Sequence, residues 1–257
     1  MKISRLLPLF LVFCLMVSLC SCLKIAEGDT SDKVYTADLY AYVSTHKGGD
    51  GYETKSTLYN SDRYTVGIHT PVLGMEEADF FLDTMTESIV NDFKDTMSTV
   101  DKPEDGSKGV LFGDYSIHAT AKYVSVLMTY QIRYPGKDPI TEYRSVFYSI
   151  ADQTILTLAD LLGTPNLAGA AQLIIASLES DQNLALHMGE DYFSKLSLTD
   201  ASVAAFFLQD GGITLYFNAN TILDAYTSPL TFFYEKATFT SVLAEGMYQR
   251  IYDDSAN

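Results

Sequence analysis

All three cysteines of this chain, Cys14, Cys20 and Cys22, lie within its first 22 residues. A domain formed by the remaining residues therefore has no disulfide bond and no thiol chemistry. Small secreted domains commonly depend on disulfides for their stability. About 235 residues are nevertheless enough to bury a hydrophobic core, as one large domain or as two small ones. The fold must consequently be stabilised by apolar packing.

The segment that holds the cysteines has the pattern of a secretory signal. Lys2 and Arg5 precede an apolar run over residues 6–19, and the small Ser21 follows the run. A charged head, an apolar stretch and a small residue at the cleavage point are typical of a signal peptide. The run is shorter than the roughly 20 apolar residues of a spanning helix. We expect residues 1–21 to be a signal peptide that is removed.

The cysteine after the expected cut resembles the lipobox of bacterial lipoproteins. Cys22 follows the small Ser21, whereas the bulky Leu19 precedes Cys20, so Cys22 is the preferred lipidation site and Cys20 the alternative. We expect a membrane anchor, with palmitate among its acyl chains, on Cys22. The mature protein would then lie at the cell membrane, lipid-anchored on its extracytoplasmic face. The sequence leaves open whether this is the inner or the outer membrane.

The mature chain is strongly acidic. Removal of residues 1–21 takes away Lys2 and Arg5 and no acidic residue, which changes the net charge from −16 to −18. Such a chain repels nucleic acids and anionic membrane surfaces, so we expect no nucleic-acid partner. It would attract a basic partner, although a solvated acidic surface explains the same composition. The oligomeric state is left open.

Hydrophobic periodicity predicts an acidic tether over residues 22–32, a first α+β part over residues 33–155 and a second over residues 156–257. In the first part, we expect strands at 34–43, 62–69 (ended by Pro71), 115–121, 124–132 and 141–150, with a glycine-rich turn at 48–51. Residues 75–100 predict one long helix. Its apolar stripe comprises Ala78, Phe81, Leu82, Met85, Ile89, Phe93 and Met97.

The second part is predicted to mix short helices with a hairpin. We expect a turn at 158–162, helices at 166–178 and 191–196, hairpin strands at 203–208 and 213–217 joined by Asp210-Gly211-Gly212, a strand at 230–234 and a closing helix or tail at 241–252. The consecutive strands favour antiparallel pairing. The predicted fold class is therefore α+β, with a mostly antiparallel sheet packed against one long and one shorter helix.

No catalytic or metal-binding motif stands out. The histidines, His46, His69, His118 and His187, lack ligand spacing, and the chain has no HExxH, Gly-x-Ser-x-Gly or phosphate-binding glycine motif. Glu76, Glu77 and Asp79 suit the start of a helix, where the dipole favours negative charge. We expect no catalytic residue, no metal and no cofactor. A glycosidase needs only two carboxylates, and 33 acidic residues single out no pair.

Aromatic residues are abundant: the chain has 18 tyrosines and 14 phenylalanines but no tryptophan. Most of them are expected to fill a core between sheet and helix. Tyrosines in loops are suited to binding surfaces, because the ring offers both an apolar face and a polar hydroxyl. Tyr134 and Tyr143 are the candidate binding residues on this basis.

Two segments carry a resemblance to a known family. Residues 156–162, LTLADLL, lead into a helix, and residues 206–217, FFLQDGGITLYF, form a hairpin with an aromatic end. Both resemble the extracytoplasmic domain of RsiV-type anti-sigma factors and of PdaC-type deacetylase N-terminal regions, a domain of unknown function. The resemblance extends over about residues 60–245, by the order of elements more than by identity. Where relatives carry a glycine-alanine-histidine step, this chain has residues 134–139, YPGKDP.

The resemblance implies an α+β fold and a recognition role, since the RsiV-type domain senses lysozyme, a basic protein. We expect no sigma-factor inhibition, because only five residues precede the apolar run, and no deacetylase activity, because the metal-binding histidines are absent. The predicted function is a lipid-anchored extracytoplasmic binding or sensing module, non-catalytic, for a basic, lysozyme-like protein or a cell-wall glycan. An envelope hydrolase and a structural lipoprotein are the alternatives.

Overall fold

The computed structural model describes residues 51–104, 106–163, 168–186, 188, 203–219, 221–223 and 228–252. The expected signal peptide, Cys22, the tether, the strand at 34–43, the helix at 191–196, His46 and His187 lie outside these residues. None of the helices among the described residues has the length and apolarity needed to cross a membrane.

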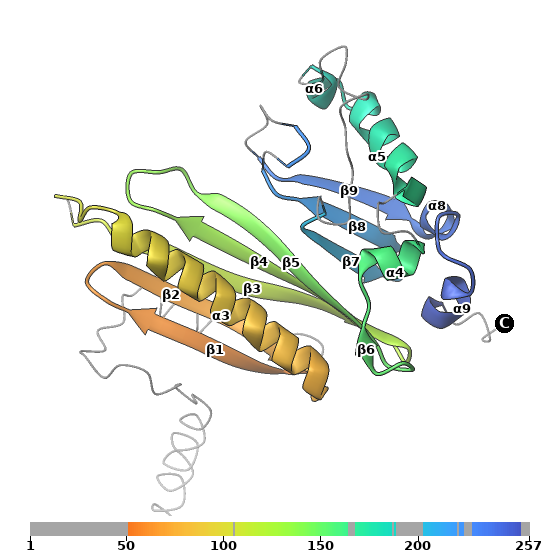
Figure 1. Ribbon diagram of the computed structural model, residues 1–257, viewed down its shortest axis with the longest axis horizontal. Helices are drawn as coiled ribbons and strands as arrows, with labels where there is room; N and C mark the ends of the chain where they lie inside the picture. Colours follow the sequence, from red (N-terminus) through yellow and green to blue (C-terminus); the bar gives the residue numbers. More distant parts are fainter. Residues whose placement is uncertain are drawn as a thin grey trace, which may run out of the picture.

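Six strands form the first sheet, in the order in which they occur in the chain (Figure 1). They are β1 Glu53–Asn60, β2 Tyr64–Val72, β3 Gly109–Ala119, β4 Tyr123–Arg133, β5 Ile140–Ser149 and β6 Thr154–Ile155. Neighbours are antiparallel except β2 and β3, which run parallel because helix α3 connects them. The predicted three-strand meander is therefore confirmed as β3–β4–β5.

Helix α3, Glu76–Thr99, lies across one face of this sheet (Figure 1). Its apolar stripe packs on alternate residues of the strands, among them Ile68, Val126 and Tyr130. The buried residues of the helix are Ala78, Leu82, Met85, Thr86, Ile89, Val90, Phe93 and Met97. The prediction was wrong for Phe81, whose side chain is 44% exposed. Adjacent helical residues point about 100° apart, so Phe81 falls outside the stripe that contains Leu82.

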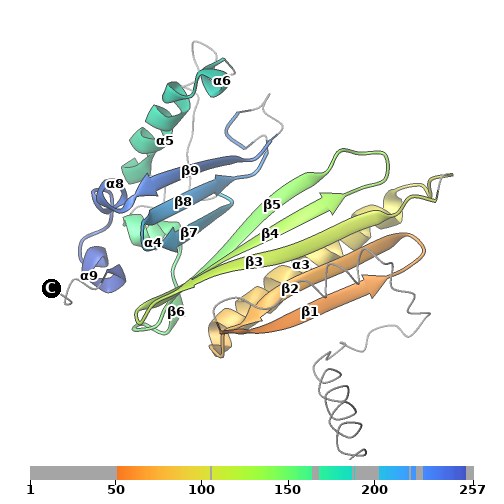
Figure 2. The same cartoon turned by 180° about the vertical axis from the view of Figure 1, so that it is seen from behind.

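A second sheet lies against the other face of the first sheet, as the view from behind shows (Figure 2). Its antiparallel strands are β7 Ala205–Gln209, β8 Gly212–Phe217 and β9 Leu230–Glu235, so the predicted hairpin and following strand are confirmed. Strand β7 forms its edge and packs on β4 and β5, where Ala205 and Phe207 contact Leu127. The main-chain N–H groups of Phe206 and Leu208 donate to the hydroxyls of Ser145 and Ser125, each over 3.0 Å.

Short helices complete a second core around this sheet. They are α4 Leu158–Leu162, α5 Ala168–Ser180, α6 Gln182–Ala185, α8 Lys236–Thr240 and α9 Met247–Ile251. Helix α4 begins with a capping box between Thr157 and Asp160 and ends at Gly163 in the left-handed conformation. Ile174 and Leu178 of α5 are buried in this core, together with Phe147 of the first sheet. The α+β fold class predicted from the sequence is confirmed.

Further details differ from the sequence predictions. The sequence did not predict β1, which is half-exposed and has few strongly hydrophobic residues, or the short elements β6, α6 and α8. Pro71 does not end a strand but lies inside β2, opposite Thr54 of β1. It is tolerated there because the pairing of β2 with β3 ends at Ile68, so beyond that point β2 pairs, within the described part of the chain, with β1 alone.

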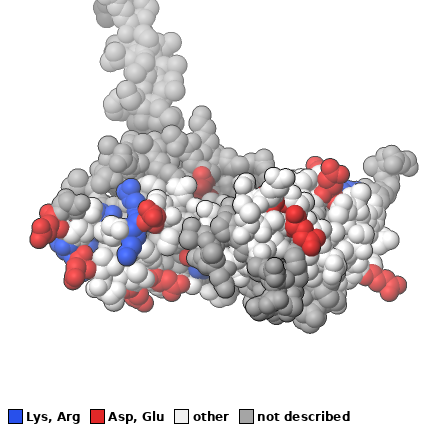
Figure 3. Space-filling model, turned by 90° about the horizontal axis from the view of Figure 1, so that it is seen from above, with Lys and Arg blue, Asp and Glu red and all other residues white. Residues whose placement is uncertain are grey.

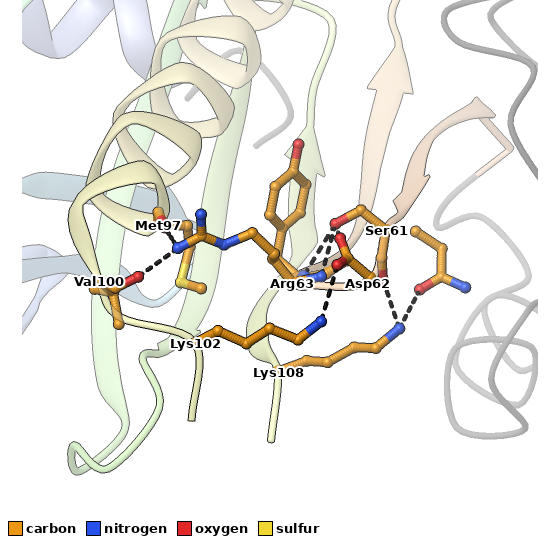
Figure 4. Close-up of polar contacts among 9 residues, drawn as sticks. Ser61, Asp62, Arg63, Met97, Val100, Lys102 and Lys108 are labelled. Carbon is orange, nitrogen blue, oxygen red and sulfur yellow. Dashed lines mark hydrogen bonds and ion pairs between the residues drawn. The ribbon is translucent and has the colours of Figure 1, made fainter. Parts of the chain in front are cut away.

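Basic side chains gather at the C-terminal end of α3 (Figure 4). The guanidinium of Arg63, in the turn between β1 and β2, donates from Nη2 to the main-chain oxygens of Met97, over 2.8 Å, and Val100. The last turn of α3 contains no basic residue of its own. Arg63 thus supplies from another element the positive charge and the donors that a helix C-terminus requires. Beside it, Lys102 pairs with Asp62 over 3.1 Å on the exposed surface.

Removal of the Arg63 cap should destabilise the protein. Arg63→Met leaves two carbonyl groups of α3 without their charged donor, and we expect the free energy of unfolding to fall by roughly 1–3 kcal/mol. Lys102→Met is the matched control, because its ion pair is solvent-exposed and should leave stability nearly unchanged. Urea denaturation of both variants measures the difference. An equal effect of the two substitutions would contradict the capping role.

Candidate functional site

Two phenylalanines are exposed side by side near the N-terminal end of α3. Phe80 is 72% exposed and Phe81 44%. Glu76 and Glu77, which are also exposed, lie one turn before them. The helix dipole accounts for acidic residues at this position. It does not account for two solvent-facing aromatic rings, and grouped apolar side chains of this kind mark interaction surfaces.

An open hollow of about 510 Å³ adjoins these side chains. It is lined by Glu76, Glu77 and Phe80 of α3, Tyr148 of β5 and Gln153 of the following turn. Phe81 lines a second hollow of about 160 Å³, which reaches the start of α4 and of β7. We refer to Glu76, Glu77, Phe80, Phe81 and Gln153 as the acidic–aromatic surface.

The turn that contributes Gln153 is held in place by Asp152. Ser149 donates to the Asp152 carboxylate over 2.6 Å, and Arg250 of α9 forms an ion pair with it. The Ser149 hydrogen bond and the Arg250 guanidinium lower the pKa of this carboxyl. Gln153 has a φ of 54° and is the one non-glycine residue of the described chain with a positive φ. A left-handed residue other than glycine costs about 1 kcal/mol, so neighbouring contacts hold this turn in its conformation.

Asp79 fixes the start of α3 itself. Its carboxylate accepts hydrogen bonds from the main-chain N–H groups of Leu73, Gly74 and Met75 over 2.7, 3.0 and 3.1 Å. The Met75 side chain provides no such cap. Asp79 therefore stabilises the start of α3. Glu76 and Glu77 are exposed, and the Thr154 hydroxyl donates to the Glu77 carboxylate over 3.5 Å.

Glu76 and Glu77 are the two carboxylates among the described residues that line the larger hollow. A glycosidase holds two carboxyl groups on opposite sides of the bond that it cleaves. Glu76 and Glu77 are consecutive on one helix, where adjacent side chains point about 100° apart around the axis. The described residues contain no group of three or more His, Cys, Asp and Glu side chains that could hold a metal ion.

His118 and Asp210 form a separate polar contact between the two sheets. The Nε2 atom of His118, at the end of β3, lies 3.2 Å from Oδ1 of Asp210, in the β7–β8 turn. The His118 ring packs 5.9 Å from that of Tyr123. Burial raises the pKa of the Tyr123 hydroxyl above its usual range and that of Tyr252 to about 12. This group of residues joins the two parts of the molecule.

The two tyrosines predicted as binding residues lie on different faces of the first sheet. Tyr134 stacks on Phe93 of α3, with ring centroids 5.6 Å apart. Tyr143 packs against Tyr216 of the second sheet at 4.6 Å, and its main-chain N–H donates to Asn218. Both rings thus contribute to packing, and their role in binding stays a prediction. His69 is buried in β2, 3.9 Å from Asp114.

Sequence reasoning did not select Phe80 or Gln153. A signal for Phe80 was present, because two consecutive aromatic residues in an amphipathic helix cannot both face the same core. No comparable signal existed for Gln153, since its position depends on the contacts of Asp152 with Ser149 and Arg250. Ser149 and Arg250 are far apart in sequence.

Comparisons with known proteins give structural neighbours only. No protein-family model and no curated protein matches the sequence. A DUF3298 family protein from Pseudomonas aeruginosa PAO1 is similar in structure, with 12% identity and a TM-score of 0.48 over 77% of this chain and 97% of that chain. A DUF3298 family member from Bacteroides fragilis has 12% identity and a TM-score of 0.49, over 80% of this chain and 99% of its own. Neither structure is named for a ligand or an activity.

The exposure of Phe80 predicts that its removal leaves the fold intact. Phe80→Ala should change the free energy of unfolding by no more than about 0.5 kcal/mol, as is usual for surface substitutions. Leu82→Ala, two residues away in the buried stripe, should cost about 2–5 kcal/mol through the cavity it creates. Urea denaturation of the two variants tests this contrast. A large loss in Phe80→Ala would mean that the ring supports the fold.

Proposed function

We propose that this chain is a lipid-anchored, extracytoplasmic binding module of the cell envelope that holds a basic partner protein through the acidic–aromatic surface. The observation that carries the proposal is the exposure of Phe80 and Phe81 beside Glu76 and Glu77, next to an open hollow. Aromatic anchors and complementary charge are the usual determinants of affinity and of association rate at protein interfaces.

The charge distribution supports a cationic partner. The net charge of −18 expected for the mature chain attracts basic proteins over a distance of about 10 Å at moderate ionic strength. Figure 3 shows acidic side chains in several separate groups on one face, with lysine and arginine confined to fewer places. Dispersed charge steers a partner toward the molecule, whereas the hollow and its phenylalanines provide a defined place for contact.

The lysozyme class is the first partner to test, because it is basic and because the sequence resembles a lysozyme-sensing domain. We expect saturable binding of hen lysozyme to the chain without residues 1–21. Glu76→Gln combined with Glu77→Gln should weaken it about tenfold, and Phe80→Ala combined with Phe81→Ala by at least as much. Isothermal titration calorimetry at low and at high salt measures both effects.

The matched control for charge lies on the same helix. Asp92→Asn combined with Asp95→Asn removes two exposed carboxylates about 24 and 28 Å along α3 from Glu76 and should change the affinity little. Equal weakening by both double variants would mean that net charge, and not the surface, determines binding. Binding to purified peptidoglycan in place of lysozyme would transfer the proposal to a glycan ligand. Binding to neither would reject it.

The anchor is tested separately. Cys22→Ser should abolish labelling by radioactive palmitate and release the protein from the membrane fraction, because no acyl chain can attach to serine through this route. Cys20→Ser is the control and should leave both unchanged. Retained labelling in Cys22→Ser and its loss in Cys20→Ser would assign the lipid to Cys20. Absence of labelling in the unmodified chain would reject the lipoprotein signal.

A further inference from the structure

A groove of about 390 Å³ runs between the outer strand of the second sheet and the helices beside it. Its walls are residues 229–233, at and before the start of β9, and Ser177, Ser180, Asp181 and Leu184 of the α5–α6 segment. The groove is far from the acidic–aromatic surface, which lies on α3 and the β5–β6 turn. Figure 1 shows α5 alongside β9.

The main-chain groups of β9 that face away from the sheet can be assigned from the pairing register. Phe206 and Leu208 of β7 direct their N–H groups away from β8, toward Ser145 and Ser125. The strict alternation of antiparallel ladders then places the N–H and C=O groups of Leu230, Phe232 and Tyr234 toward β8. Thr231 and Phe233 therefore point theirs outward, and no strand of the described residues pairs with them.

Between Leu230 and Glu235 this outer edge contains no proline, no lysine and no bulge. Exposed edge strands are commonly blocked by proline, lysine or a bulge. Here Pro229 and Lys236 lie just outside the two ends of β9, and neither falls between Leu230 and Glu235. The Phe233 side chain is 51% exposed on the face away from the buried Phe232. Among the described residues, this edge therefore keeps main-chain groups with which a further strand can pair.

The walls of the groove specify the chemistry of that strand. Asp181 is the one charged side chain among the described residues that line it, and they include no lysine or arginine. The Asp181 carboxylate is oriented by the N–H groups of Asn183 and Leu184, which donate over 2.9 and 3.2 Å. Leu184, Leu230 and Phe232 add apolar surface. Alternate residues of an added strand point to the same side, so a basic and an apolar residue two positions apart fit this wall.

We infer that β9 and the α5–α6 segment form a peptide-binding groove, in which an extended segment of another protein pairs with Thr231 and Phe233 and places a lysine or arginine beside Asp181. Addition of a strand to a sheet edge is an established mode of recognition, in which main-chain hydrogen bonds give affinity and side-chain pockets give specificity. The inference does not depend on the proposed function, because it concerns other elements of the fold.

The test uses the full-length chain in detergent and the peptide acetyl-Thr-Lys-Thr-Val-Thr-Lys-Thr-amide, in which the lysines and the valine are two positions apart and therefore lie on the same side. We expect saturable binding and slower hydrogen exchange at the Thr231 and Phe233 amides. The peptide with glutamate in place of each lysine, and the peptide N-methylated at its internal amides, should bind at least about tenfold more weakly. Equal binding of the N-methylated peptide, or protection of amides elsewhere than β9, would overturn the inference.

Two variants isolate the two interactions. Thr231→Pro removes a donor that points away from β8, so the sheet keeps its ladder while the edge loses a hydrogen bond, and binding should fall about tenfold. Thr231→Ala is its control and should bind normally. Asp181→Asn keeps an N-cap residue but removes the charge, and should weaken only the lysine peptide. Unchanged binding in both Thr231→Pro and Asp181→Asn would reject the groove.

If Thr231→Pro fails to fold, the hydrogen exchange of the Thr231 and Phe233 amides in the unmodified chain, measured with and without peptide, still tests the inference. Sedimentation of the full-length chain without peptide provides one more outcome. A dimer that Thr231→Pro dissociates would show that β9 pairs with a second copy of this chain, and this would overturn the assignment to another protein. A protein that remains monomeric and binds the lysine peptide, with protection confined to β9, supports the inference.

Discussion

The second sheet meets the first through one of its edges, and this contact determines which surfaces of the molecule face solvent. The N–H groups of Phe206 and Leu208 would be buried without partners if Ser145 and Ser125 did not accept their hydrogen bonds. An unsatisfied buried donor costs about 1–3 kcal/mol. Two small hydroxyl side chains on β5 and β4 thus make it feasible to bury the edge of β7. The opposite edge, β9, is consequently left beside α5.

The same arrangement separates the two candidate interaction surfaces. Helix α3 covers one face of the first sheet, and the second sheet occupies part of the other. The acidic–aromatic surface forms where α3 begins, beside a turn that Arg250 of α9 ties down through Asp152. Lys122 of the β3–β4 turn also donates to the carbonyl groups of Gln249 and Tyr252. Helix α9 therefore holds the turn that carries Gln153 in place, although it contributes no side chain to the acidic–aromatic surface.

Periodicity was sufficient to predict the elements whose burial follows one face. Helix α3 and the β3–β4–β5 meander were predicted because their apolar residues recur at the period of a helix or a strand. The β7–β8 hairpin was predicted from its Asp210-Gly211-Gly212 turn between two apolar strands. Strand β1 was missed because a half-exposed edge strand with a polar sequence carries no such pattern. Pro71 was misjudged because its tolerance depends on where β3 stops pairing with β2, which is a tertiary property. The candidate site was harder to predict, since the exposure of Phe80 is an absence of packing and Gln153 depends on distant residues.

The described residues contain no cysteine, so they obtain their rigidity from packing and hydrogen bonds, and the two candidate surfaces differ in which groups they expose. At the start of α3, exposed rings and carboxylates project from a helix whose apolar stripe is buried in the core of the first sheet. Binding there, as proposed, would depend on side chains and would be sensitive to salt and to aromatic area. At β9 the proposed recognition groups are main-chain N–H and C=O groups of a strand that pairs with β8. They depend on the register of the sheet rather than on the identity of one residue.

Gly212 is one position where a substitution would shift that register. It has a φ of 148° and no room for a Cβ, because one would lie 2.0 Å from the main-chain oxygen of Tyr234. Gly212, at the start of β8, therefore controls the alignment of the adjacent edge strand β9.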